Sequence, residues 1–239
     1  MIVVTWNVLH RIHAVNWDEP AIRGWPDEPS RIGSIADLLA ELPADVICLQ
    51  EVSGDQLAML RDVVPGELFA TRYPRVPRYT RRFEAATLRD PAEYLVTIVR
   101  DGGAHLLAEE AFPSDRGKGF HALELASGAT VIDTHVSFGD KGVEQLARLA
   151  SIARDATEPA IVCGDFNAPR ETCAAALGAA FVPAVSPRGA LATRPPTTPD
   201  APPQDIDHVL VRGAQITAVQ VLDSGGRSDH NPVAVRLSR

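Results

Sequence analysis

Polar side chains that can hold a metal ion or transfer a proton recur along this chain at the ends of apolar, strand-like runs. The run Ser228-Asp229-His230 follows Gly225-Gly226 and sets a carboxylate beside an imidazole at the start of a strand-like segment. Four similar runs are Thr5-Trp6-Asn7, Gln50-Glu51, Gly164-Asp165-Phe166-Asn167 and Ile206-Asp207-His208. A fold that brings polar residues to strand ends from all along the chain assembles one site.

Three of these residues carry oxygen atoms suited to a hard divalent cation. Glu51 follows the apolar run 46–49 and supplies a carboxylate, a good ligand for Mg²⁺ or Mn²⁺; the alternative is an exposed residue that leads into a helix. Asn7 offers a carbonyl oxygen to metal or an amide N–H to phosphate, or else caps its strand. Asp229 offers a second carboxylate, or serves only as an ion-pair partner. We therefore predict a Mg²⁺ or Mn²⁺ site formed by Glu51, Asn7 and Asp229.

The spacing within the other runs separates residues that face the site from residues that pack behind it. Asp165 and Asn167 alternate with Phe166, and successive side chains of a strand point to opposite faces. We therefore expect Asp165 and Asn167 to face the site and Phe166 to be buried. By the same alternation His208 points away from Asp207, and we expect His208 to be structural.

The periodicity of apolar residues predicts the elements that position these runs. Residues 31–42 repeat apolar side chains at three- and four-residue spacings, which indicates a helix. Ser53 and Gln56 match a capping box that opens a second helix, through residue 64. Further helices are expected at 142–156 and 171–177. Strands are expected at 2–5, 46–49, 67–73, 94–99, 105–111, 120–125, 130–136, 160–163, 206–211, 216–222 and 232–237. This mixture, with much antiparallel pairing, favours two sheets covered by helices.

Three segments are predicted to be loops. Residues 9–29 contain His13 and two tryptophans but no sustained apolar period. Residues 72–82, here called the arginine loop, hold five arginines and two tyrosines in eleven residues. The arginine loop is either a solvated connector or a segment that grips substrate phosphates through Arg75, Arg78 and Arg81. Residues 181–204 carry seven prolines, too many for a helix or an internal strand, and are long enough for a rim loop.

The composition is that of a single globular domain spanning residues 1–239. Hydrophobic residues make up 45% of the chain and charged residues 23%, and no apolar run approaches the length of a membrane span, about 20 residues. Met1 leads directly into an apolar run, so we expect no signal peptide and a cytoplasmic protein. Cys48 and Cys163 lie in apolar runs and are expected to be buried thiols. No obligate protein partner is evident.

Six motifs, in order along the chain, resemble the motif series of the endonuclease/exonuclease/phosphatase superfamily. They are Thr5-Trp6-Asn7-Val8, Ile47-Cys48-Leu49-Gln50-Glu51-Val52, Asp133-Thr134-His135, Gly164-Asp165-Phe166-Asn167-Ala168, Ile206-Asp207-His208 and Ser228-Asp229-His230. The resemblance implies an α/β fold (α+β in some schemes), a four-layer sandwich with two central mixed or antiparallel sheets flanked by helices. It also implies hydrolysis of a phosphoester with Mg²⁺ or Mn²⁺.

The resemblance assigns roles to the acid–base residues as well. His230 matches the histidine that acts as general base or binds the scissile phosphate, and Asp207 matches the carboxylate that fixes the tautomer of that histidine. His135 matches a histidine that donates to phosphate or to the leaving group. Asn167 then donates to the phosphate, and Asp165 orients or deprotonates the water. Whether Asp165 or His230 is the base stays open.

One strand departs from the family pattern. Members often carry a Gly-rich strand that bears a tyrosine and ends in Ser-Arg, and here the corresponding run is 93–100 without those glycines. Tyr94 is matched to that tyrosine as a substrate-binding residue. The chain is short for the superfamily, which leaves little room for large substrate-binding insertions.

Charge and motif content leave three functions open. The first is a divalent-metal-dependent phosphodiesterase for nucleic acid or a nucleotide, which the arginine loop favours. The second is a phosphatase or phosphodiesterase for a small or lipid phosphoester, which the net charge of −8 favours because an acidic protein does not hold long duplex nucleic acid by charge. The third is a catalytically silent binding module, disfavoured because every expected catalytic position is filled. We predict the first.

Overall fold

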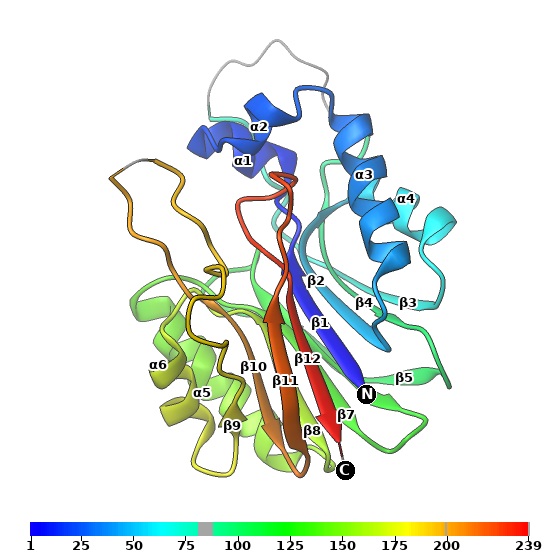
Figure 1. Ribbon diagram of the computed structural model, residues 1–239, viewed down its shortest axis with the longest axis vertical. Helices are drawn as coiled ribbons and strands as arrows, with labels where there is room; N and C mark the ends of the chain where they lie inside the picture. Colours follow the sequence, from blue (N-terminus) through cyan, green and yellow to red (C-terminus); the bar gives the residue numbers. More distant parts are fainter. Residues whose placement is uncertain (81–87, 199, 239) are drawn as a thin grey trace.

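Two six-stranded sheets form the centre of this computed structural model, which describes residues 1–80, 88–198 and 200–238. The first sheet consists of β1 (Ile2–Asn7), β2 (Val46–Ser53), β3 (Glu67–Arg72), β4 (Glu93–Val99), β11 (Gln215–Val221) and β12 (Val233–Ser238). The second consists of β5 (Ala104–Ala111), β6 (Gly119–Leu125), β7 (Thr130–His135), β8 (Ala160–Asp165), β9 (Val182–Pro183) and β10 (Asp207–Arg212). Their orders are β11-β12-β1-β2-β4-β3 and β5-β6-β7-β8-β10-β9, and both sheets are mixed (Figure 1).

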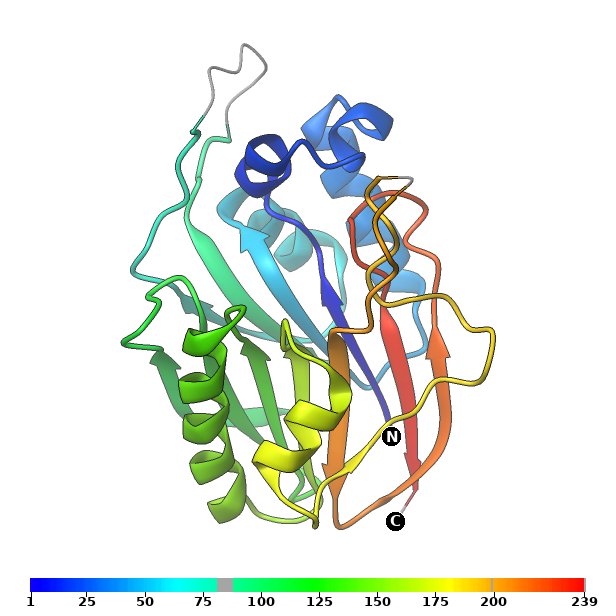
Figure 2. The same ribbon diagram turned by 90° about the vertical axis from the view of Figure 1, so that its left-hand side faces the viewer.

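Helices cover the outer face of each sheet. α3 (Glu28–Glu41) and α4 (Gly54–Val63) pack on the first sheet, and α5 (Asp140–Asp155) and α6 (Arg170–Leu177) pack on the second (Figure 2). The helix over 28–41 begins at Asp27, whose side chain accepts a hydrogen bond from the Ser30 backbone N–H, and the predicted capping box of Ser53 and Gln56 opens α4. The predicted four-layer α/β sandwich is therefore confirmed.

The alternation of side chains along each strand divides the core into three layers. In β2, Val46 and Cys48 point into the space between the two sheets, whereas Ile47 and Leu49 point towards α3 and α4. The same alternation runs through the neighbouring strands, so each face of each sheet is covered. Cys48 and Cys163 are buried free thiols, as predicted.

The segment over residues 9–29, predicted to be a loop, instead contains two short helices, α1 (Arg11–Trp17) and α2 (Ala21–Gly24). The His10 side chain caps α1 by accepting a hydrogen bond from the Ile12 backbone N–H. Ile12, Ala14 and Val15 then bury one side of the helix. The apolar repeat covers only two turns, too few for periodicity to indicate a helix, and tertiary packing supplies the rest of its stability.

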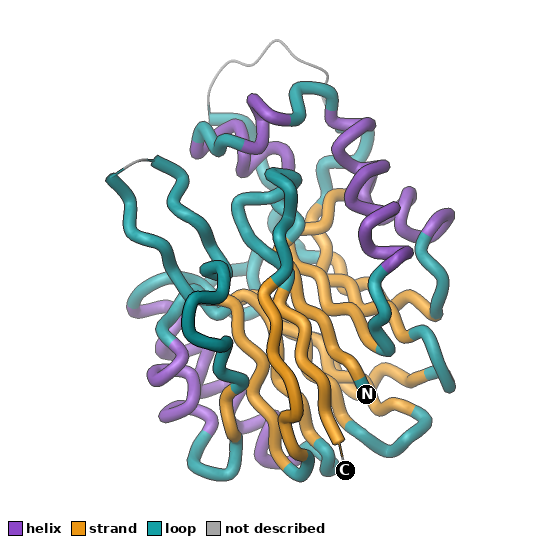
Figure 3. The backbone as a smooth tube through the Cα atoms, viewed as in Figure 1, coloured by secondary structure: helices purple, strands orange, loops and turns teal. Residues whose placement is uncertain are grey.

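Strand ends and loops gather at one edge of the sandwich, opposite the two chain termini (Figure 3). β1 runs parallel to β2, and β7 runs parallel to β8, so all four carboxyl ends meet at this edge. β10 and β12 run antiparallel to these strands, so their amino ends lie at the same edge. This arrangement places every polar run of the sequence on one side of the molecule. Among the described residues no helix has the length and apolar character that crossing a membrane requires.

Candidate active site

The register of three neighbouring strands sets the centre of the site. Asp165, the last residue of β8, lies opposite Asp207 on β10 and opposite His135 on β7. Close contact between β7 and β8 requires Gly164, because a Cβ atom at this position would lie 1.9 Å from the Thr134 carbonyl oxygen. A glycine is therefore required before Asp165 because no larger residue fits there.

Asp207 and His230 form a buried hydrogen-bonded pair. The Nδ1 atom of His230 lies 2.8 Å from Asp207 Oδ2 and 3.1 Å from Oδ1, so Nδ1 carries a proton and Nε2 is left to face the site. The Nε2 atom lies 3.8 Å from Asp229 and 4.0 Å from Asp165. Burial opposes the imidazolium form, but Asp207, Asp229 and Asp165 outweigh burial and raise the pKa of His230 to about 10.

Asp165 is held by hydrogen bonds on both of its oxygens. Its Oδ2 atom accepts from Asn7 Nδ2 at 3.0 Å and lies 3.2 Å from His135 Nε2, and its Oδ1 atom accepts from the Asn167 backbone N–H at 3.0 Å. Burial alone would raise the pKa of Asp165, but His135, His230 and Lys118 lower it. Asp165 is therefore an ionised carboxylate among three nitrogen-bearing side chains.

Glu51 reaches the site because β2 contains a bulge. The register with β4 shifts between Leu49 and Val52, and Glu51 has a φ of 58°, a left-handed conformation that is uncommon outside glycine. Its Oε2 atom accepts a hydrogen bond from the His10 backbone N–H at 3.2 Å, and its Oε1 atom lies 3.8 Å from His135 Nε2. The bulge thus turns the carboxylate towards the strand edge.

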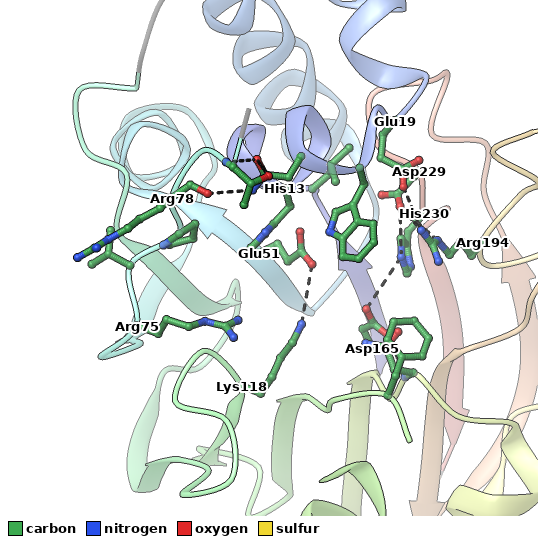
Figure 4. A pocket seen from close by; sticks show the side chains of 18 of the residues that line it. His13, Glu19, Glu51, Arg75, Arg78, Lys118, Asp165, Arg194, Asp229 and His230 are labelled. Carbon is green, nitrogen blue, oxygen red and sulfur yellow. Dashed lines mark hydrogen bonds and ion pairs between the residues drawn. The ribbon is translucent and has the colours of Figure 1, made fainter. Parts of the chain in front are cut away.

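The three residues predicted to hold a metal ion have different partners in the structure. Asn7 donates to Asp165, and its Oδ1 atom accepts from the Leu9 backbone N–H. Asp229 accepts two hydrogen bonds from the Arg194 side chain, at 3.1 and 3.2 Å. Both carboxylates line the cleft, but that of Asp229 is paired with Arg194, so Glu51 best fits a hard cation. Figure 4 shows Glu51 on one side of the cleft and Asp229 on the other.

Sequence reasoning missed several residues of the site. His13 lies on a helix that was expected to be a loop, and Lys118 immediately precedes β6, 4.0 Å from Glu51 and in contact with His135. Arg194 comes from the Pro-rich segment and bridges Asp229 to Glu19. Burial and the Asp229 carboxylate outweigh the opposing Arg194 charge and raise the pKa of Glu19 to about 7. No local pattern marks these positions, because only the fold brings them together.

Glu93 was missed although the sequence carries a signal for it. Along β4, Tyr94, Val96 and Ile98 pack on the helix side of the sheet. The alternating residues, which include Glu93 and Thr97, therefore face the second sheet and the site. Tyr94 does not line the cleft, whereas the buried Glu93 contacts a residue that does: its Oε2 atom lies 3.2 Å from His13 Nε2.

Two of the three predicted arginines line the cleft. Arg75 is paired with Asp115 at 2.7 Å. Arg78 is exposed, and no ion pair of its side chain occurs within residues 1–80, 88–198 and 200–238. The helix α1 residue Asn16 holds the arginine loop by donating to the Arg78 carbonyl and accepting from the Thr80 backbone N–H. Arg81 lies outside the described residues.

Many of these groups line one cleft of about 1050 Å³, and Asn7, His135 and Asp207 are buried behind its wall. Glu51, Asp165 and His230 contribute to its wall, and Trp17 and Phe138 line it with 76% and 58% of their surface exposed. Exposed aromatic rings on a cleft wall are suited to stacking against planar groups. His208 points away from Asp207, and its Nε2–H donates a hydrogen bond to the Ala168 carbonyl at 2.9 Å, as expected of a structural residue.

Solved structures of low sequence identity share this fold. A functionally unknown conserved protein from Enterococcus faecalis V583 is 17% identical, with a TM-score of 0.72 over 100% of this chain and 99% of that one. D. rerio TDP2 complexed with single strand DNA product is 16% identical, with a TM-score of 0.71 over 100% and 99%. A Bacteroides thetaiotaomicron VPI-5482 mannosyl-6-phosphatase is 17% identical, with a TM-score of 0.67 over the full length of both chains.

Sequence comparison agrees with the structural likeness. A search of curated proteins finds no match to this chain. The family model described as Endonuclease/Exonuclease/phosphatase family matches residues 4–230, from β1 to His230. That range includes every strand end that contributes to the cleft. The chain therefore belongs to the endonuclease/exonuclease/phosphatase family, whose members are phosphoester hydrolases that typically depend on a divalent metal.

Proposed function

We propose that this protein is a Mg²⁺- or Mn²⁺-dependent phosphodiesterase that cleaves a phosphodiester of a nucleic acid or nucleotide by attack of water. The observation that carries the proposal is the convergence of acid–base groups on Asp165, which lies 3.2 Å from His135 and 4.0 Å from His230. Hydrolysis of a phosphodiester needs a proton acceptor for the water and donors for the phosphoryl oxygens. Both kinds of group are present within one buried cluster.

The side chains divide these tasks by charge and position. Asp165, held as a carboxylate, orients the water and accepts its proton. His230, whose Nδ1 is fixed by Asp207, presents Nε2–H to a phosphoryl oxygen, and Asn167 offers its amide to the same group. His135 and Lys118 supply further donors beside Asp165. A divalent cation bound by Glu51 would polarise the phosphoryl oxygen and lower the pKa of a bound water.

The walls of the cleft favour a substrate with more than one phosphate or with planar bases. Arg78 offers a cation and Trp17 and Phe138 offer exposed rings, the combination that binds single-stranded nucleic acid. The solved TDP2 structure with a similar fold was crystallised with a single-stranded DNA product. A small phosphoester is the second candidate, because Arg75 is already neutralised by Asp115 and one solved neighbour is a mannosyl-6-phosphatase.

Matched substrates separate these alternatives. We expect hydrolysis of bis-p-nitrophenyl phosphate and of a single-stranded oligonucleotide in the presence of Mg²⁺ or Mn²⁺, and loss of both activities in EDTA. Faster release of p-nitrophenol from p-nitrophenyl phosphate than from the diester would favour the small-phosphoester function. The Glu51→Ala variant should be inactive at ordinary metal concentrations while it stays folded by circular dichroism. Turnover of neither ester with any divalent metal would leave only the binding-module function.

A further inference from the structure

Beside the acid–base groups lies a separate cluster of side chains that can ligate a metal ion. One ligand atom each from His13, Glu51 and Glu93 lies within 4.8 Å of the other two. His13 comes from α1, Glu51 from the bulge in β2 and Glu93 from the first residue of β4. Three elements that are distant in sequence therefore deliver one nitrogen and two carboxylates to the same point.

The spacing of these atoms fits direct coordination. His13 Nε2 lies 3.2 Å from Glu93 Oε2. Two ligands at right angles around an ion with bonds of about 2.1 Å lie about 3 Å apart, so this pair matches adjacent coordination positions. Figure 4 shows Glu51 between His13 and Lys118, with His13 on the side away from Asp165. The cluster is thus distinct from the group formed by Asp165, Asp207 and His230.

Burial leaves one carboxylate of the cluster short of a partner. Glu93 is fully buried, and its Oε1 atom has no hydrogen-bond partner among the described residues. Lys118 lies 4.0 Å from Glu51 but is also in contact with His135. A buried carboxylate oxygen without a partner is unfavourable, and the neighbouring carboxylates of Glu93 and Glu51 repel each other. A divalent cation between them would remove both costs.

A second buried atom without a partner adjoins the cluster. His10 accepts a hydrogen bond at Nδ1 from the Ile12 backbone N–H, so its Nε2 atom carries the proton, and this N–H has no acceptor among the described residues. The rings of His10 and His13 lie 5.4 Å apart. An unused donor next to two carboxylates is placed to bind water or another ligand of an ion at this point.

We propose that His13, Glu51 and Glu93 form a binding site for a divalent transition metal, Mn²⁺ or Zn²⁺, in preference to Mg²⁺. An imidazole nitrogen suits Zn²⁺ and the two carboxylates suit Mn²⁺, whereas Mg²⁺ prefers an all-oxygen environment with several retained waters. This metal site rests on the proposed function only through Glu51, which belongs to the site and is also the residue assigned there to bind the catalytic cation. It places the cation on the α1 side of Glu51, held by His13 and Glu93, rather than between Glu51 and Asp229.

Electron paramagnetic resonance of bound Mn²⁺ tests the site without measuring activity. Full-length protein is stripped with a chelator and titrated with MnCl₂, and the loss of the free-ion signal gives the affinity. Glu93→Gln, which keeps the size of the side chain, should weaken Mn²⁺ binding by about tenfold or more. Electron spin echo envelope modulation should detect a directly bound ¹⁴N nucleus in the wild type and lose it in His13→Ala.

Two control variants locate the nitrogen. His105 pairs with Glu124 at 2.9 Å on an exposed strand away from the cleft, so His105→Ala should keep both the affinity and the ¹⁴N coupling. Asp207→Asn alters the other cluster and should also keep the coupling. Coupling that survives in His13→Ala, or unchanged affinity in Glu93→Gln, would overturn the site. Nitrogen coupling without ester hydrolysis would refute the proposed function alone, and hydrolysis without coupling would refute this site alone.

Discussion

Asp207 determines which nitrogen of His230 faces the cleft. In Asp207→Asn, the amide can present either an oxygen or an N–H group to Nδ1, and one of these choices puts the imidazole in the wrong tautomer. We expect turnover to fall by several orders of magnitude, with a serine-protease precedent of about 10⁴-fold. Steady-state kinetics on the diester measures the loss, and calorimetric titration with Mn²⁺ should show nearly unchanged metal affinity.

The same titration would reveal a different role for Asp207. If metal affinity falls as steeply as turnover, Asp207 is a ligand, because the group that includes Asp165 and His230 also lies within coordinating reach. Asp205→Asn serves as the matched control. Asp205 precedes β10 by two residues and accepts the Thr193 backbone N–H outside the cluster.

Single residues also show where sequence reasoning succeeded and where it failed. Asp165 was chosen because it follows an apolar run, and a strand end is visible in sequence, whereas His135 was chosen from the family resemblance. Tyr94 was chosen from the family match alone, but the alternation of the strand places Tyr94 on the helix side and Glu93 on the side of His13. His13 and Lys118 follow no such rule, since long-range packing alone brings them to Glu51.

At the scale of an element, the arginine loop can be tested through Arg78. If Arg78 contacts a phosphate beyond the scissile one, Arg78→Ala should raise KM for an oligonucleotide. It should also reduce the slope of log affinity against log salt by about one. Hydrolysis of bis-p-nitrophenyl phosphate, which is too small to reach the loop, should barely change. Fluorescence anisotropy at several salt concentrations gives the slope.

A variant with the same change of charge separates this contact from a general effect. Arg61 is exposed on α4 and does not line the cleft, so Arg61→Ala should leave the salt slope unchanged. An equal effect of Arg78→Ala on both substrates would indicate damage to the site. No effect on either substrate would remove Arg78 from binding and favour a small phosphoester.

At the scale of the whole molecule, the two sheets are joined by a chain of polar side chains across the core. Thr71 donates to the exposed Glu109 at 2.6 Å, so His121 Nδ1 donates to Thr71 at 3.0 Å. His121 Nε2 then accepts from Thr97 at 2.7 Å, and Thr97 lies 3.2 Å from Asp133 Oδ2. Because Thr97 has one proton, Asp133 must supply the other. Burial accordingly raises the pKa of Asp133 well above its ordinary value and lowers that of His121 to about 3.

A neutral Asp133 makes the stability of the fold depend on pH. The unfolded chain loses this proton above about pH 4 while the folded chain keeps it, so the carboxyl group destabilises the fold increasingly as pH rises. In Asp133→Asn, the amide oxygen still accepts from Gln50 and the amide N–H can donate to Thr97, but the side chain no longer titrates. Above pH 4, we expect the free energy of unfolding of Asp133→Asn to rise relative to that of wild type by about 1.4 kcal/mol per pH unit. Urea unfolding of both proteins at several pH values measures this difference.

His121 acts in the opposite direction at lower pH. Its folded pKa is depressed, so stability falls by about 1.4 kcal/mol per pH unit as pH decreases from 6.5 to about 3, in both proteins. The control is Asp37→Asn, an exposed carboxylate on α3, which should follow wild type at every pH. Strong destabilisation of Asp133→Asn at pH 7 would instead mean that Asp133 and His121 form an ion pair.

The sequence predicted the layers of this molecule better than the contacts between segments that are distant in sequence. Alternating apolar strands and capped helices are local patterns, so the two sheets and four covering helices could be predicted from them. The short helix α1 and the polar chain through His121 depend on contacts between distant segments. The Pro-rich segment was correctly excluded as an internal strand, yet its Arg194 forms an ion pair with Asp229 at the cleft, which the sequence did not indicate.

Helix α1 connects the residues around Glu93 with the arginine loop. It is only seven residues long, and His13 and Asn16 lie three positions apart on it. His13 contacts the buried Glu93, while Asn16 donates a hydrogen bond to the Arg78 carbonyl of the arginine loop. A shift of this short helix would therefore move both contacts together. If His13, Glu51 and Glu93 bind a cation as proposed, binding there would therefore be coupled through α1 to the position of the arginine loop.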